Sequence, residues 1–391
     1  MTPTQPADST FALVRNDLPL RILRMLGIAP KHGLGVVRRA VFFALLCWLP
    51  IVVWAWMGHR LLDSMTGEPL LLHFGIHVRC LIAVPLLILA EAPASVIINR
   101  ILQQFLQSGL IPPSRATDFH AAIARAGKLR DATMPWIAVL ALSLVWLAGS
   151  PNDMYAHELS WAAVNGEMGW GGWWFKYVAR TVFVFLVLGW IWRILLLVML
   201  FRQIQTLDLS LVPNHPDRMA GLGFLQAVPK TFSLVTFALA AVLASRWAHD
   251  SIYHDAPLAS FKMPLLAFIL IWSVMLLLPA LVFCAKMIAC KRQALAEYRA
   301  LTAMHGRLMH ARWVTSTASD QTPHPMFEAP ELGASADVGT IYQSVEHMRT
   351  LPIGKASVMG ILLPMLVPML LVAMTQFPLK DILTTLMKAL M

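Results

Sequence analysis

The stretch Tyr177–Phe201 reads YVARTVFVFLVLGWIWRILLLVMLF and decides the class of fold. Among these residues only Arg180 and Arg193 carry a charge. As an α-helix the stretch is about 37 Å long, and crossing about 30 Å of hydrocarbon takes about 20 mainly apolar residues. The stretch is therefore predicted to be a transmembrane helix.

Six further stretches have the same apolar character and complete a set of seven predicted spans. They are Ala40–Leu62, Leu72–Ile98, Met134–Gly149, Thr231–Trp247, Met263–Ala289 and Ala356–Gln376. The second is the most polar and the third is the shortest.

The composition of the whole chain agrees with this interpretation. Of 391 residues, 58% are hydrophobic and 13% are charged, whereas a soluble domain carries about 25% charged residues. This balance excludes a single soluble domain, and the high hydrophobicity excludes a disordered chain. The four cysteines all lie in apolar stretches, which excludes a disulfide framework. We predict an all-α polytopic membrane helix bundle of about seven spans.

Lysine and arginine are distributed unevenly between alternate connections of these spans. The N-terminal segment and the connections on its side hold 22 of them, the opposite side holds 6, and three lie within spans. Because cytoplasmic loops are enriched in Lys and Arg, the N-terminus is predicted inside and the C-terminus outside. The net charge of +10 then fits contact with anionic membrane lipids. Nucleic acid is not a predicted partner, since no loop combines a dense basic stripe with stacking aromatics.

The predicted spans divide the chain into five parts. They are a cytoplasmic N-terminal segment with an interfacial helix (1–39), spans one to six (40–290), a cytoplasmic helical extension with a linker and a short helix (291–351), the seventh span (352–377) and an outer amphipathic tail (378–391).

Several segments outside the spans have a helical pattern. The amphipathic helices predicted for the cytoplasmic side are Phe11–Leu26 and Ser114–Ala132. The sixth span is predicted to continue as one helix over Met263–Trp313, because Ala, Leu, Arg and Glu dominate its second half. A linker over 315–336 and a short helix over Val338–Leu351 follow, and a cytoplasmic protein partner at 291–351 is a further hypothesis.

Charged side chains within the spans are the first candidate site. They are Arg79 and Glu91 in span two and Arg180 and Arg193 in span four. Helical rise places Glu91 and Arg193 at a similar depth. They are interpreted either as a structural ion pair or as the lining of a hydrophilic pathway. If only these two residues pair, replacing both should recover the stability that each single replacement loses.

The connection between spans four and five is the second candidate site. It contains His215, Asp217 and Arg218, followed by Gly221 and Gly223. The glycines permit a close approach or a positive φ. Two hypotheses remain open for this loop: a rigid turn whose side chains cap helix ends, or a site for a ligand, proton or ion at the inner mouth of the bundle.

Other chemistry has little support in the sequence. His73 and His77 stand four residues apart, which is a metal-ligand spacing on a helix, but no third ligand is apparent. The common catalytic motifs are missing from the sequence. The sequence therefore nominates no catalytic residue and no cofactor.

Three features resemble a known group of proteins. Residues 215–225 read HPDRMAGLGFL, residues 342–354 read YQSVEHMRTLPIG, and Pro364 and Pro368 interrupt the last span. These features resemble a group of bacterial multi-pass integral membrane proteins with an HPDRxxGLGFL-type cytoplasmic loop. The resemblance implies a location in the bacterial cytoplasmic (inner) membrane and implies no assigned activity.

Three functions are consistent with these patterns. Buried charge, proline-interrupted spans and the polar loop favour membrane transport or channel-type conduction of a small solute or ion, by a homo-oligomer. One alternative is a membrane enzyme acting on lipid, with His215 and Asp217 as acid and base. The other is a non-catalytic sensor or assembly subunit that recruits a cytoplasmic partner.

Overall fold

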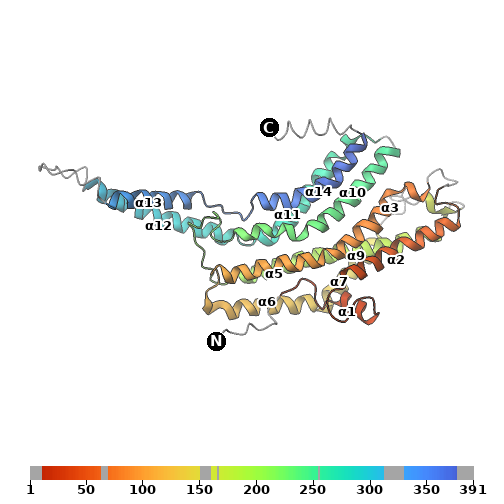
Figure 1. Ribbon diagram of the computed structural model, residues 1–391, viewed down its shortest axis with the longest axis horizontal. Helices are drawn as coiled ribbons and strands as arrows, with labels where there is room; N and C mark the ends of the chain where they lie inside the picture. The colour runs from red at the N-terminus through yellow and green to blue at the C-terminus, as the bar shows by residue number, and fades with distance from the viewer. Residues whose placement is uncertain are drawn as a thin grey trace.

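The computed structural model describes residues 11–62, 69–149, 160–164, 167–253, 256–311 and 330–376. Their helices run roughly along one long axis, and several lie side by side (Figure 1). The strands β1 (Ala163–Val164) and β2 (Glu167–Met168) form one short antiparallel hairpin, with Ala163 opposite Met168. The predicted all-helical architecture is confirmed.

The α-helices have the following bounds in chain order. They are α1 (Leu18–Met25), α2 (Val36–Met57), α3 (Phe74–His77), α4 (Val84–Leu89), α5 (Glu91–Gln107), α6 (Ala116–Asp131), α7 (Thr133–Ala148), α8 (Trp170–Trp174), α9 (Arg180–Gln205), α10 (Ser233–Tyr253), α11 (Lys262–Leu281), α12 (Cys284–His310), α13 (Pro330–Glu346) and α14 (Lys355–Gln376). Wider π-helical turns, Val78–Ala83 and Phe175–Ala179, join α3 to α4 and α8 to α9.

Six helical stretches in the described part of the chain are long and apolar enough to cross a membrane. They are Val36–Met57, Phe74–Gln107, Trp170–Gln205, Gly223–Tyr253, Ala259–Leu281 and Lys355–Met374. A seventh exists if α6 and α7, which meet at an angle of 45°, count as one broken span. The 16 residues of α7 alone reach about 24 Å, which is less than the hydrocarbon thickness.

Helix α9 lies at the centre of the bundle and contacts α4, α6, α7 and α11. Its fully buried Trp190 and Phe201 belong to the largest apolar core, together with Phe105, Phe232 and Phe283. Large apolar side chains remain exposed on the outer helices α7, α11 and α14. An apolar outer face of this kind suits a lipid environment.

The N-terminal helix is shorter than predicted. Only Leu18–Met25 is helical, and the predicted helix over Phe11–Leu26 is wrong for its first seven residues. A helix beginning at Phe11 would place Pro19 in its interior, where proline removes a hydrogen bond and clashes with the preceding turn. Residues 11–17 instead run as irregular chain along the bundle, and their side chains Phe11, Leu13 and Val14 are buried in the core.

The single long helix predicted over Met263–Trp313 is also wrong. Helix α11 ends at Leu281 and α12 begins at Cys284, so a turn separates them. Pro279 lies in the last turn of α11, and the hydrogen bond that it cannot donate would go to Met275 within α11, so this proline precedes the turn and does not by itself explain it. The backbone N–H of Phe283 bonds to the carbonyl of Ala280, three residues earlier (3.2 Å), whereas an α-helix bonds to the residue four earlier.

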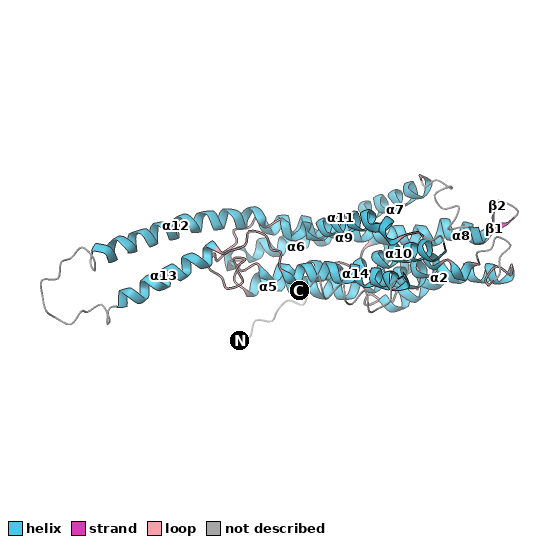
Figure 2. Cartoon of the chain, turned by 90° about the horizontal axis from the view of Figure 1, so that it is seen from above, coloured by secondary structure: helices cyan, strands magenta, loops and turns pink. Residues whose placement is uncertain are grey.

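The region after α12 differs from the prediction in part. Helix α13 begins at Pro330, so the end of the predicted 315–336 linker is helical, and α13 ends at Glu346. The rest of that linker and the predicted tail 378–391 lie outside the described residues. Helices α12 and α13 contact each other and project together beyond α5 and α6 (Figures 1 and 2).

Candidate functional site: a buried ion network beside a basic cavity

Glu91, the first residue of α5, accepts hydrogen bonds from two arginines. Arg39 of α2 donates from both terminal nitrogens, Nη1 (2.6 Å) and Nη2 (3.3 Å). Arg193 of α9 donates through Nη2 at 3.0 Å. Glu91 and Arg193 therefore meet, as their predicted depths indicate, and the arrangement also includes Arg39.

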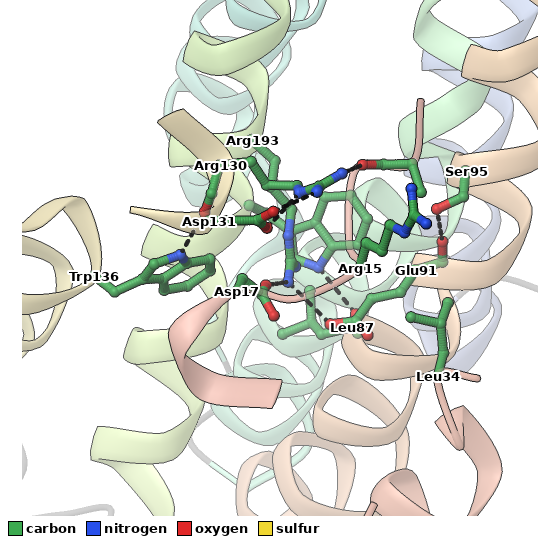
Figure 3. Close-up of polar contacts among 12 residues, drawn as sticks. Arg15, Asp17, Leu34, Leu87, Glu91, Ser95, Arg130, Asp131, Trp136 and Arg193 are labelled. Carbon is green, nitrogen blue, oxygen red and sulfur yellow. Dashed lines mark hydrogen bonds and ion pairs between the residues drawn. The ribbon is translucent and has the colours of Figure 1, made fainter. Parts of the chain in front are cut away.

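A fourth charged residue completes the network. Asp17, directly before α1, accepts a hydrogen bond from Arg193 Nη2 at its Oδ2 atom (3.3 Å). Figure 3 shows Arg193 between Asp17 and Glu91, which come from segments far apart in the sequence. We call Asp17, Arg39, Glu91 and Arg193 the ion network. Its members Asp17 and Arg39 were not identified from the sequence, since both lie before the first predicted span.

The ion network is almost fully removed from solvent. The exposed fractions are 1% for Asp17 and Glu91, 3% for Arg39 and 4% for Arg193. Two guanidinium groups face two carboxylates, so the formal charges cancel. A buried charge is costly unless it is paired. This balance is what permits four ionisable groups to lie inside an apolar bundle.

Three buried polar atoms of the ion network make no hydrogen bond within the described residues. Among the described residues, Asp17 Oδ1 and the Nε atoms of Arg39 and Arg193 have no hydrogen-bond partner. Burial raises the pKa of the Asp17 carboxyl, and the neighbouring Arg193 opposes this only partly. Asp17 therefore takes up a proton at a higher pH than an exposed aspartate.

Two tryptophans enclose the Arg193 guanidinium. Its carbon lies 4.9 Å from the ring centre of Trp190 and 5.5 Å from that of Trp136. Trp190 Nε1 donates to Leu87 O (2.9 Å), and Trp136 Nε1 donates to Arg130 O (3.3 Å). Cation–π contact and these hydrogen bonds hold Arg193 in one position.

A cavity of about 740 Å³ lies next to the ion network. The titratable residues of its lining are mainly basic: Arg15, Arg24, Lys31, His32 and Arg130, with Asp131 as the acidic residue. Ser95 also lines the cavity and donates its hydroxyl to the carbonyl of Glu91, one helical turn earlier (2.9 Å). Figure 3 shows Arg130, Asp131 and Ser95 near Glu91 and Asp17. One turn of α5 and the N-terminal segment therefore separate the cavity from the network.

The other two predicted intramembrane charges lie elsewhere. Arg79 is in the first π-helical turn, about 18 Å from Glu91 by helical rise. Its guanidinium lies over Phe175 (5.2 Å) and Phe183 (5.8 Å). Arg180 is buried directly after the second π-helical turn. The structure does not bring these two arginines into the ion network.

The loop between α9 and α10 is organised by Asp217. Its Oδ1 accepts the backbone N–H groups of Met219 (2.7 Å) and Gly221 (3.2 Å), and its Oδ2 accepts that of Gly223 (2.8 Å). The N–H of Asp217 in turn donates to His215 Nδ1 (3.2 Å). The carboxylate thus satisfies backbone donors that the turn would otherwise leave unpaired.

The backbone after Asp217 requires glycine at two positions. Gly221 has a φ of +88°, which favours glycine, and a Cβ at Gly223 would lie 2.9 Å from Asp217 Oδ2. Arg218 also has a positive φ, +56°, and its carbonyl accepts the N–H of Arg349 (2.7 Å). Two of the segments that carry the family resemblance therefore contact each other. These contacts favour the rigid-turn hypothesis for the loop.

We expect Asp217→Asn to lower the free energy of unfolding by about 1.5–3 kcal/mol, the contribution of a charge-assisted hydrogen bond. One carboxylate oxygen becomes an NH₂ group that cannot accept, so at least one backbone N–H loses its acceptor. Unfolding of the purified protein in detergent measures the change. Asp208→Asn is the matched control, because Asp208 pairs with Arg115 at the surface and should contribute less than about 1 kcal/mol. Equal small effects would show that the carboxylate does not organise the loop.

The two histidines considered as metal ligands do not share a site. His73 precedes α3, and its ring stacks on that of His249, with ring centres 5.1 Å apart. His77 Nδ1 accepts the Trp48 indole N–H (2.9 Å), and its Nε2 lies 3.1 Å from Leu70 O. Within the described residues, no group of three His, Cys, Asp or Glu side chains could hold a metal ion. The predicted helical face with both histidines is wrong, because His73 lies outside the helix.

Comparison of the chain with models of protein families, with curated proteins and with solved structures finds no match.

Proposed function

We propose that this protein conducts or transports a small solute or ion across a membrane. The observation that carries the proposal is the ion network, in which four ionisable side chains lie buried between helices that are long enough to be spans. Charged groups within a membrane are costly, and those that are retained commonly line a path for ions or solutes. The adjacent cavity supports the proposal, because it offers an open space with charged side chains beside the ion network.

The topology completes this proposal. In this proposal the chain has seven spans in a bacterial inner membrane, with the N-terminus and the basic cavity on the cytoplasmic side and the C-terminus outside, an orientation that the distribution of Lys and Arg supports. A homo-oligomer is part of the same proposal. Residues 11–17 then form the boundary between the cavity and the ion network, and displacing Asp17 from Arg193 would open that boundary.

The decisive variant is Asp17→Asn, which removes one carboxylate charge from the ion network at nearly constant side-chain volume. Asparagine can still offer an oxygen to Arg193, and Asp17 Oδ1 has no partner to lose. We expect flux to change by about tenfold or more, which corresponds to about 1.4 kcal/mol in a barrier. Conductance in planar bilayers bathed in potassium chloride and proton uptake into vesicles loaded with a pH-sensitive dye are the two measurements.

Arg307→Gln is the control, because Arg307 is an exposed residue of α12 and its replacement removes one charge far from the ion network. Its flux should equal that of the unmodified protein. An Asp17→Asn protein that is folded and has unchanged flux in both assays would remove the ion network from the pathway. Absence of any protein-dependent flux would count against transport of these ions.

The projecting pair α12 and α13 supports a second candidate, the sensor or assembly subunit. Apart from the shared contact, exemplified by Arg299 Nε and the Tyr342 hydroxyl (3.2 Å), most of the surface of α12 is exposed. The lipid-enzyme alternative has less support. The carboxylate of Asp217 already accepts three backbone hydrogen bonds, which makes it a poor candidate for an acid or base.

A further inference from the structure

Arg24 and Lys31 give the basic cavity positive charge that the described side chains do not neutralise. Arg130 forms a two-point ion pair with Asp131 (2.8 and 2.7 Å), so these two charges cancel. Arg24 instead donates to three neutral oxygens, which belong to Asn16, Arg15 and Gly33. Its positive charge therefore remains, and an anion in the cavity would be attracted to it.

Lys31 adds to this positive charge at the mouth of the cavity, and His32 beside it adds a ring N–H group. Both are exposed, and neither makes a hydrogen bond or an ion pair within the described part of the chain. Arg15 is exposed on the same lining. Guanidinium and ammonium groups are the donors that proteins use to bind phosphate. The cavity thus has suitable side chains for an anion with several acceptor oxygens.

Exposed apolar side chains lie beside these basic groups. At the end of α1, Met25 is 84% exposed and Leu26 is 66% exposed, and at the start of α2, Val37 is 64% exposed. Arg38 Nη2 donates to Gly27 O (2.9 Å), which ties the start of α2 to the end of α1. A free inorganic anion gains nothing from contact with an apolar surface, whereas a lipid presents an anionic headgroup and apolar acyl chains together.

We infer that this cavity binds the phosphate-bearing headgroup of an anionic phospholipid, with the acyl chains along the exposed side chains of α1 and α2. Basic pockets of helical membrane proteins on the cytoplasmic side bind anionic headgroups in this way. The volume of about 740 Å³ lies in the ordinary range for ligand sites, about 300–1,000 Å³. The inference rests on the proposed topology, which puts the cavity on the cytoplasmic side, and its test measures binding and not conduction.

The experiment measures lipid affinity of the full chain in a non-ionic detergent by native mass spectrometry. Phosphatidylglycerol, phosphatidylcholine and inorganic phosphate are the three probes. The test variant is Arg15→Gln with Lys31→Gln, and the control variant is Arg292→Gln with Arg307→Gln, two exposed residues of α12. We expect the test variant to bind phosphatidylglycerol about 25-fold more weakly, at about fivefold for each basic residue near an anionic headgroup. The control variant should retain the original affinity.

Three results would overturn the inference. Equal affinity for phosphatidylcholine and phosphatidylglycerol would show that the site does not select an anionic lipid. Inorganic phosphate that competes at the same concentration as phosphatidylglycerol would identify the ligand as a free anion. An equal loss of affinity in the two double variants would place the lipid elsewhere on the surface. The thermal unfolding midpoint without added lipid verifies that each variant is folded.

Discussion

Glu91→Gln is expected to lower the free energy of unfolding by about 3–5 kcal/mol, because it leaves the buried Arg39 without a carboxylate. Arg39 would lose its only ion-pair partner among the described residues, and Arg193 would keep Asp17 alone. Thermal or denaturant unfolding in detergent measures the loss. Glu297→Gln serves as the control, since Glu297 is exposed on α12 and its replacement should change stability by less than about 0.5 kcal/mol.

Double variants test the arrangement of the ion network more sharply. Glu91→Gln with Arg39→Gln removes one matched pair and leaves Arg193 with Asp17, so stability should largely recover. Glu91→Gln with Arg193→Gln should not recover, because it leaves both Arg39 and Asp17 buried without a partner. This corrects the expectation for an isolated pair of Glu91 and Arg193. Recovery in the second double variant and not in the first would contradict the four-residue network.

Trp190→Ala is expected to lower the free energy of unfolding by about 3–5 kcal/mol, the usual effect of truncating a buried tryptophan. Trp190 is fully buried, donates to Leu87 O, packs edge-on against Phe232 and lies under the Arg193 guanidinium. The variant leaves a cavity and removes the hydrogen bond to Leu87 O at once. Unfolding in detergent gives the stability, and tryptophan fluorescence of the folded variant reports the lost buried indole.

Trp56→Ala is the matched substitution on the outside of the bundle. Trp56 is in α2 and is 68% exposed, so its removal should change stability by less than about 0.5 kcal/mol. A loss of similar size in both variants would mean that the effect comes from the detergent surface and not from the core. The comparison therefore separates packing around Arg193 from general apolar contact.

The spans could be predicted because they depend on local properties of the chain. Tyr177–Phe201 and Ala356–Gln376 are each apolar over more than 20 residues, and both are helical in the structure. One error arose where a single proline mattered more than the average composition, and the other where a turn of two residues follows a proline. Pro19 shortens the first helix and Pro279 precedes the break between α11 and α12, although the surrounding residues favour a helix.

The candidate site could be predicted only in part. Depth along a helix was enough to bring Glu91 and Arg193 together, because helical rise is constant. It could not identify Asp17, whose position depends on how the irregular segment 11–17 packs against the bundle. The sequence also could not show that the Asp217 carboxylate accepts hydrogen bonds from three backbone N–H groups, since those bonds depend on the conformation of the following turn.

Helical class and apolar span length follow from the residues in order, because backbone hydrogen bonds within a helix and the apolar character of its side chains are local. The pairing of charges is not local. Arg39 and Glu91 are 52 residues apart, and Asp17 and Arg193 are 176 residues apart. Such contacts form only when the helices and the N-terminal segment pack together, since burial makes an unpaired charge costly and so selects the arrangement in which all four charges have partners.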